Sequence, residues 1–156
     1  MESMNYYFYR IEASEGTLKL IKKKNKEGDF TKVNTFEKPI TNKGLSKLYI
    51  VKHESEIIYV GIASQPMRSR LRNGFKAAGK HGYHGYQWKK LRSFDLIVWW
   101  FPNKTLKQVE AVEAEIVYLI RSRVSQWPKY QTEIHFSQVT EDEKNVARQI
   151  YEKAIQ

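Results

Sequence analysis

Two short apolar runs separated by a charged turn constrain this chain more than any other feature. Residues 47–51 form the first run and residues 57–62 the second, and both are rich in β-branched and aromatic side chains. The polar segment His-Glu-Ser-Glu lies between them, as expected for the turn of a hairpin. Because side chains alternate along a strand, pairing of the two runs can bring Tyr49 and Tyr59 to one face. We therefore predict a β-hairpin over residues 47–62.

Further patterns predict the rest of an α+β fold. Residues 94–101 form a third apolar run that ends at Pro102, and we expect this strand to pair with the hairpin in a small antiparallel sheet with a three-stranded core. Helices are expected to flank this sheet. The first follows Pro66 and ends near Gly79, and the other two begin at capping boxes that open with Thr105 and Thr140.

The N-terminal part of the chain is also rich in strand patterns. We expect residues 1–46 to be a β-rich extension packed on the main sheet, because so few residues make a poor independent core. Residues 47–156, with the C-terminal helix, then form the main domain, and the two parts make one globular unit. A short strand is also expected over residues 132–136.

Charge is distributed unevenly. The formal net charge is +10, and no acidic residue lies between Glu56 and Asp95. A long stretch of one sign on a folded domain favours a polyanion such as nucleic acid, and the alternative is a basic face that serves solubility. We expect residues 79–90 to form a mobile surface loop that contacts DNA. The candidate DNA-binding residues are Arg68, Arg72, Lys76, Lys80, His81, His84, Lys89 and Lys90.

Composition excludes several other classes. The chain has no cysteine, which excludes disulfides, thiolate metal sites and a cysteine nucleophile and is compatible with a reducing cytosol. No apolar stretch approaches the ~18 residues of a membrane helix, and the first residues lack the pattern of a signal peptide. We therefore expect a cytoplasmic protein with no membrane partner.

The hairpin and the residues that follow it resemble the GIY-YIG nuclease superfamily, and the chain is similar to a divergent, small, single-domain member. Tyr59-Val60-Gly61 matches the second signature of the family. In the first signature, Lys47 and Leu48 stand in place of Gly-Ile before Tyr49. Arg70, followed by Leu71, matches the arginine that the family places on its first helix.

The resemblance implies a site and a cofactor. One of Tyr49 and Tyr59 would activate or orient a water molecule, Arg70 would bind the scissile phosphate, and Gly61 would allow a close backbone approach. Glu115 would bind a single Mg²⁺ or Mn²⁺, in competition with Glu110 and Glu113, of which Glu113 is expected to point to a different side of the helix. Gln131 stands near the position where the family often has asparagine.

Three functions remain open at this point. The first is a metal-dependent endonuclease that hydrolyses double-stranded or branched DNA in a restriction, repair or mobile-element setting, with specificity arising from a partner or a homodimer. The second is a catalytically weak nucleic-acid-binding module that keeps the fold. The third is an adaptor that binds an acidic protein through its basic face.

Overall fold

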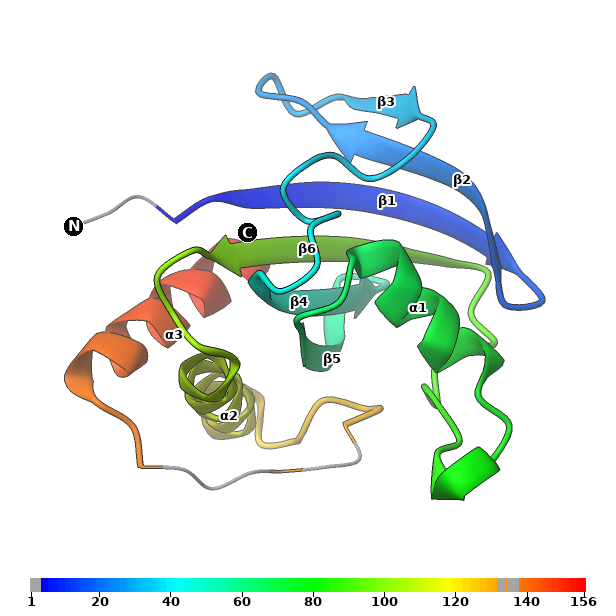
Figure 1. Cartoon of the computed structure of the whole chain (residues 1–156). Coiled ribbons are helices and arrows are strands. Elements are labelled where there is room, and N and C mark those ends of the chain that lie inside the picture. Colours follow the sequence, from blue (N-terminus) through cyan, green and yellow to red (C-terminus); the bar gives the residue numbers. More distant parts are fainter. Residues whose placement is uncertain (1–3, 132–133, 135–137) are drawn as a thin grey trace.

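The core of the protein is an antiparallel sheet of six strands in the order β3-β2-β1-β6-β4-β5 (Figure 1). The structure is a computed structural model and describes residues 4–131, 134 and 138–156. The strands are β1 (Tyr6–Ser14), β2 (Thr17–Lys24), β3 (Phe30–Val33), β4 (Ser46–His53), β5 (Glu56–Ala63) and β6 (Ser93–Phe101). The helices are α1 (Met67–Lys76), α2 (Leu106–Val124) and α3 (Glu141–Ala154), with a single 3₁₀ turn, η1 (Lys80–Gly82), after α1.

The predicted hairpin and its third strand are confirmed, but they form only half of the sheet. β4 pairs with β5 and with β6, as expected. The other edge of β6 pairs with β1 along seven residues, from Tyr6 opposite Trp99 to Glu12 opposite Ser93. A central apolar strand leaves backbone donors and acceptors on both edges, and these groups need partners. The N-terminal strands therefore continue the same sheet, and the prediction that they pack upon it is wrong.

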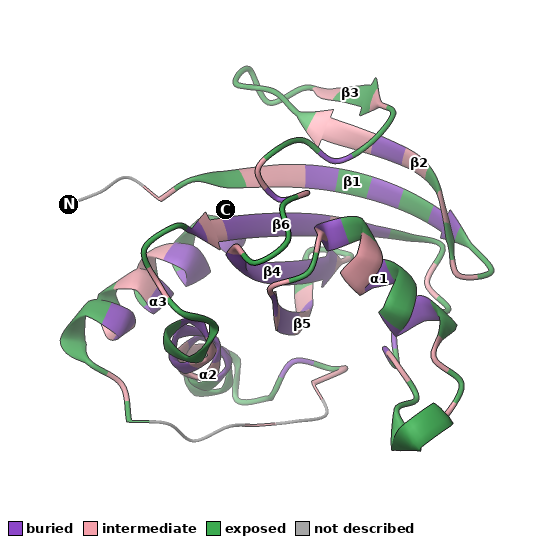
Figure 2. Ribbon diagram, viewed as in Figure 1, coloured by how far each residue is buried: buried purple, intermediate pink, exposed green. Residues whose placement is uncertain are grey.

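Two layers cover the two faces of the sheet. Helices α2 and α3 pack on the face that carries Leu48, Ile50 and Trp99. On the opposite face, Tyr49 and Val51 lie in a second core with α1 and with the segment that follows it. Figure 2 shows how burial is concentrated in β4 and β6, while β2 is mostly of intermediate exposure and β3 is intermediate to exposed. The alternation read from the sequence therefore holds along β4.

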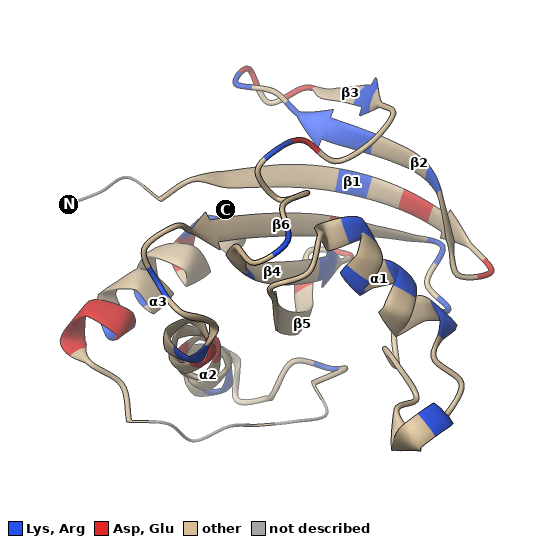
Figure 3. Ribbon diagram, in the orientation of Figure 1, with Lys and Arg blue, Asp and Glu red and all other residues tan. Residues whose placement is uncertain are grey.

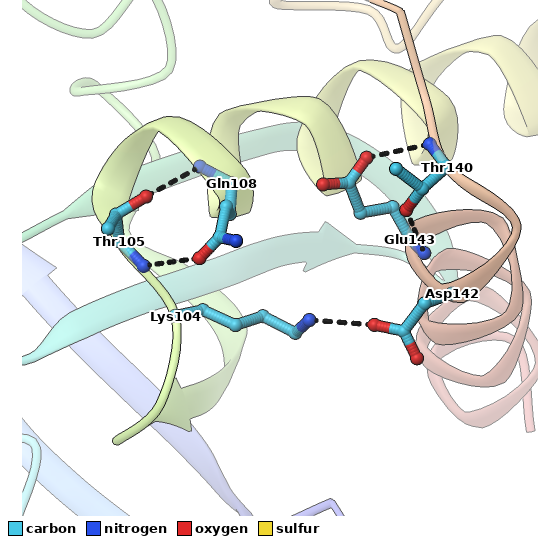
Figure 4. A network of polar contacts seen from close by, with 6 residues as sticks. All are labelled: Lys104, Thr105, Gln108, Thr140, Asp142 and Glu143. Atoms are coloured by element: carbon cyan, nitrogen blue, oxygen red, sulfur yellow. Dashed lines mark hydrogen bonds and ion pairs between the residues drawn. The ribbon is translucent and has the colours of Figure 1, made fainter.

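Both predicted capping boxes are present. The Thr105 hydroxyl accepts from the Gln108 backbone N–H at 3.2 Å, and Thr140 makes the same contact with Glu143 at 3.2 Å (Figure 4). Lys104 also binds the Asp142 carboxylate at 2.8 Å, which joins the start of α2 to the start of α3. These local contacts satisfy backbone donors at both helix N-termini.

Residues 79–90 differ from the mobile loop that we expected. Tyr86 and Trp88 are buried, with stacked rings whose centroids are 4.3 Å apart. The Tyr86 backbone N–H donates to the Gly74 carbonyl at 3.0 Å, and the Tyr86 ring occupies the space that a Cβ of Gly74 would fill. Lys89 donates to the carbonyls of Ala77 and His84. Tyr86 and Trp88 therefore anchor this segment in the core and are not presented to a ligand, while Lys80, His81, Tyr83, His84 and Lys90 remain exposed.

Two other expectations concern the rest of the chain. The strand predicted over residues 132–136 falls, apart from Ile134, outside the residues that the structure describes. Among the described residues, no helix is both long and apolar enough to cross a membrane.

Candidate active site

Tyr49 and Tyr59 lie together on the face of the sheet that α1 covers. In the β4–β5 register Tyr49 is opposite Gly61 and Val51 is opposite Tyr59, so the two phenols are diagonal neighbours. Their ring centroids are 5.9 Å apart. A Cβ on Gly61 would overlap the Cζ of Tyr49 and lie 2.5 Å from its hydroxyl oxygen. Glycine is thus required at this position because the Tyr49 phenol lies directly over the backbone of β5.

Arg70 reaches this pair of tyrosines from α1. Its guanidinium donates to the Tyr83 hydroxyl at 3.0 Å and lies 4.9 Å from the centroid of the Tyr86 ring. The hydroxyls of Tyr86 and Tyr49 are 2.7 Å apart and share a hydrogen bond. Arg70 is only partly buried, and Tyr83 is 44 % exposed, so the guanidinium lies at the surface of an aromatic cluster. Tyr83 and Tyr86 belong to this site, and the sequence analysis missed them as partners of Arg70.

Burial controls the protonation of both tyrosines. It raises the pKa of Tyr49 well above the ordinary value, and the neighbouring phenols Tyr86 and Tyr59 add to this shift. Burial also raises the pKa of Tyr59, although Arg70 offsets part of this effect. Both phenols are therefore neutral at neutral pH in the free protein. The lowered phenol pKa that suits a general base is not found, and the two hydroxyls act as hydrogen-bonding groups.

The acidic residue that reaches this site is Glu113, whereas Glu115 does not. Glu113 is 7 % exposed on α2, and its charge raises the pKa of Tyr59. Two residues along an α-helix turn by about 200°, so Glu115 leaves the helix on the other side. Glu115 is only half-buried. The structure therefore brings Glu113 to Tyr59, although the sequence argument placed its side chain elsewhere and chose Glu115.

Gln131 lies at the outer edge of β5, directly beside Tyr59. Its side-chain amide accepts from the Val60 backbone N–H at 3.0 Å and donates to the Val60 carbonyl at 3.1 Å. Tyr130 also donates through its backbone to the Ile58 carbonyl at 2.9 Å. These contacts pair the free backbone groups of the edge strand β5, as a neighbouring strand would. Gln131 and the Tyr130 backbone together thus hold the backbone on the two sides of Tyr59.

A single divalent ion fits this set of residues. Mg²⁺ prefers oxygen ligands and is often held by one or two carboxylates, with water and substrate phosphate completing its coordination. Glu113 supplies one such carboxylate beside the tyrosines. Among the described residues no three His, Cys, Asp or Glu side chains form a cluster that could hold a metal ion by themselves. The donor set therefore suits an ion that is shared with substrate.

The residues predicted to bind DNA do not form one surface around Arg70. Arg68, Arg72 and Lys76 are exposed and follow each other at intervals of four along α1. They line a shallow hollow of about 180 Å³ with Gly16 and Leu18 from the β1–β2 turn, on another side of the helix from Arg70. Lys80, His81, His84 and Lys90 are exposed beyond α1, and Lys89 is bound to backbone carbonyls.

Lys47, which stands where the family has glycine, is fully buried and anchors the start of α1. Its ammonium donates to the carbonyls of Asn42 at 2.8 Å, Leu45 at 2.9 Å and Gln65 at 2.8 Å. Gln65 immediately precedes Pro66, which opens the helix that carries Arg70. Lys47 therefore joins the tyrosine strand to the arginine helix through its side chain.

Replacing Lys47 with methionine is expected to destabilise the fold by about 3 kcal/mol at pH 7, since the three carbonyls of Asn42, Leu45 and Gln65 lose a charged donor. Burial also lowers the pKa of Lys47 to about 8. The unfolded chain then binds more protons than the folded chain between about pH 8 and 10.5, so the contribution of Lys47 to stability rises with pH in this window. Urea unfolding of both proteins across this range measures the difference. A difference that stays constant from pH 7 to 10.5 would contradict the lowered pKa, and Lys43→Met at an exposed site is the control.

Comparisons of the chain with protein-family models, with curated proteins and with solved structures gave no match.

Proposed function

We propose that this protein is a metal-dependent endonuclease of the GIY-YIG type that hydrolyses phosphodiester bonds in DNA. The observation that carries this proposal is the approach of Arg70 and Glu113, from two different helices, to the same residue, Tyr59. Both charges act on that phenol, and Tyr49 lies against it over Gly61. A cation and a carboxylate that both act on Tyr59, together with the two phenol hydroxyls, match the needs of phosphodiester hydrolysis.

Each residue has a role in this proposal that follows from its chemistry. Arg70 presents a planar fork of donors that suits two oxygens of one phosphate. The neutral phenols of Tyr49 and Tyr59 orient the attacking water and a phosphate oxygen through hydrogen bonds. Glu113 would hold Mg²⁺ or Mn²⁺, which would supply charge neutralisation at the phosphate and the leaving oxygen. Glu113 replaces Glu115 as the proposed metal ligand.

DNA is the substrate that best fits the charge of the molecule. The net charge of +10 favours a polyanion, and Figure 3 shows Lys and Arg along α1 and beyond it. Arg68, Arg72 and Lys76 lie on the same helix as Arg70 but on another side. We assign them to phosphates that flank the cleaved bond rather than to the cleaved phosphate itself.

One observation favours the alternative, a nucleic-acid-binding module with little activity. The raised pKa of Tyr49 and that of Tyr59 disfavour a phenolate in the free protein. A bound divalent ion and a bound phosphate both change this electrostatic balance, since nearby charge shifts a pKa. Retained DNA binding with no cleavage in Mg²⁺ or Mn²⁺ would support the module.

Arg70→Lys tests the proposed phosphate contact. We expect the initial rate of plasmid nicking to fall by at least about tenfold, because lysine keeps the charge but loses the two-pronged contact. Arg68→Lys, on the other side of α1, is the matched control and is expected to cleave within about twofold of the native rate. Equal rates for Arg70→Lys and Arg68→Lys would show that Arg70 does not hold the scissile phosphate.

A further inference from the structure

The face of the sheet opposite the candidate active site is covered over only half of its width. Helices α2 and α3 pack against β4, β5 and β6 on this face. No described helix packs over the same face of β2 and β3, and Figure 1 shows these strands at the end of the sheet farthest from α2. We call this region the β1–β3 face and define it by Phe8, Arg10, Lys22, Lys24, Phe30 and Lys32.

Three cations lie in a row across this face. Arg10 is directly opposite Lys22 in the β1–β2 register, and Lys22 is directly opposite Lys32 in the β2–β3 register. Like charges directly opposite each other destabilise a sheet. Asp95 on β6 pairs with Arg10 at 3.0 Å, and Glu12 follows two residues along β1. Neither carboxylate lies between Lys22 and Lys32 in the register, so the row keeps an excess of positive charge (Figure 3).

An aromatic row runs beside the cations. The rings of Phe8 and Phe30 meet edge to face with centroids 5.7 Å apart. Each ring has a cation near its face, with Lys24 at 4.9 Å from the Phe8 centroid and Arg10 at 4.1 Å from the Phe30 centroid. Tyr6 is 36 % exposed, and the Lys153 ammonium lies 5.3 Å from the centroid of its ring. The face therefore presents aromatic surface that is shielded by charged side chains.

A groove lies at the open end of this face and continues round the end of the sheet to Tyr7 and Lys23 on the opposite face; of the residues that define the β1–β3 face, it includes Phe8 and Lys24. Its volume is about 980 Å³, and among the described residues four lysines and one glutamate line it, together with Tyr6, Tyr7 and Phe8. The lysines come from β2, from the β2–β3 turn and from the end of α3. A groove with this charge and these rings suits a chain of phosphates whose bases are accessible.

We infer that the β1–β3 face binds a single strand of nucleic acid. Phosphates bind along the row of Arg10, Lys22 and Lys32 and at the neighbouring Lys24, and these ion pairs draw Arg10 away from the Phe30 ring and Lys24 away from the Phe8 ring. The uncovered rings of Phe8 and Phe30 then stack on bases, as aromatic side chains do in other single-strand binders. A duplex keeps its bases paired and stacked. It would therefore contact the cations of this face, but its bases would not stack on the rings of Phe8 and Phe30. The surface is on the other face of the sheet from Tyr49 and Tyr59, and the inference does not depend on the proposed nuclease activity.

Binding of labelled oligothymidylate of about 15 nucleotides, a length near the upper site size of single-strand binders, tests this inference. Fluorescence anisotropy of the full chain is measured in EDTA, so that cleavage plays no part. We expect Lys22→Ala/Lys32→Ala to weaken binding at low salt by at least about tenfold and to reduce the salt slope by about 1.4, because two phosphate contacts are lost. The exposed pair Lys43→Ala/Lys107→Ala removes the same charge elsewhere and is expected to change binding by less than about twofold.

Phe8→Leu/Phe30→Leu separates stacking from charge. This variant keeps all cations and is expected to lose about tenfold in affinity for the single strand, with duplex binding unchanged. Thermal unfolding of each variant confirms that it is folded. The inference is overturned if native protein does not bind oligothymidylate, if the Lys43/Lys107 pair weakens binding equally, or if the leucine variant loses duplex and single strand alike. Equal competition by polyglutamate would overturn it in favour of an acidic protein partner.

Discussion

Glu113→Gln is expected to reduce metal-dependent DNA cleavage by at least about a hundredfold, whereas Glu115→Gln keeps a rate within about threefold of native. Groups that only support a metal ligand already change affinity or activity by about 10- to 100-fold. Loss of a carboxylate that binds the ion directly is expected to reduce metal affinity or activity by at least as much. Initial rates of plasmid nicking at saturating Mg²⁺ measure the effect.

The physical basis of this difference is the position of the two side chains on α2. Glu113 lies within the buried stripe of the helix, with Val109 four residues before it and Ile116 three residues after it. Its charge is therefore close to the sheet and acts on Tyr59. Glu115 is half-buried on the other side of the helix. Glutamine keeps the shape of both side chains and removes only the charge.

Metal binding provides a readout that is independent of cleavage. Mn²⁺ affinity of the native chain in the presence of a non-cleavable DNA is expected to fall in Glu113→Gln and to stay unchanged in Glu115→Gln. If the two variants lose Mn²⁺ affinity and activity equally, the losses come from a general change in α2 or in net charge, and Glu113 is not a specific metal ligand. If Glu115→Gln alone is inactive, the assignment of the metal ligand to Glu113 is wrong.

Gly61→Ala is expected to damage both stability and activity. The added Cβ overlaps the Tyr49 ring, and Tyr49 cannot move aside because it is fully buried and bonded to the Tyr86 hydroxyl at 2.7 Å. Overpacking of this kind costs about 1–3 kcal/mol. Displacement of a site residue by an ångström can reduce the rate by about a hundredfold. Urea unfolding and plasmid nicking measure the two effects.

A second variant separates the two consequences of this substitution. In Gly61→Ala/Tyr49→Leu the shorter side chain makes room for the new methyl group. Much of the lost unfolding free energy is expected to return, while cleavage stays low because the phenol is missing. Native-like activity of Gly61→Ala would show that the close contact between Gly61 and Tyr49 has no role in the site.

The sequence was sufficient wherever structure is determined locally. The hairpin followed from alternation around a polar turn, and the helix starts followed from Thr105 and Thr140, whose side chains bond to backbone three residues away. The pairing of β1 with β6 was missed because their partners are far apart in the chain, and apolar strands do not specify which neighbour they join. The core position of Tyr86 was missed because it depends on Gly74, and glycine gives no such signal by itself.

The periodicity of the long helix contains a signal that favours Glu113 over Glu115. The apolar positions of the long helix recur at helical spacing, and Glu113 falls on that series rather than beside it. A charge on a buried stripe is informative, since such residues are rarely buried without a partner. The family resemblance pointed to Glu115, whereas this periodicity favours Glu113. The roles of Tyr83 and Tyr86 near Arg70 have no comparable local signal.

The most direct test of the central claim is a titration of native protein with Mg²⁺ and Mn²⁺ on supercoiled plasmid, with EDTA as the control. The account predicts nicked and linear products that increase with metal concentration, stop in EDTA and carry hydrolysed phosphodiester ends. Saturable DNA binding with no products in either metal would contradict the endonuclease and would leave the protein as a binding module on this fold.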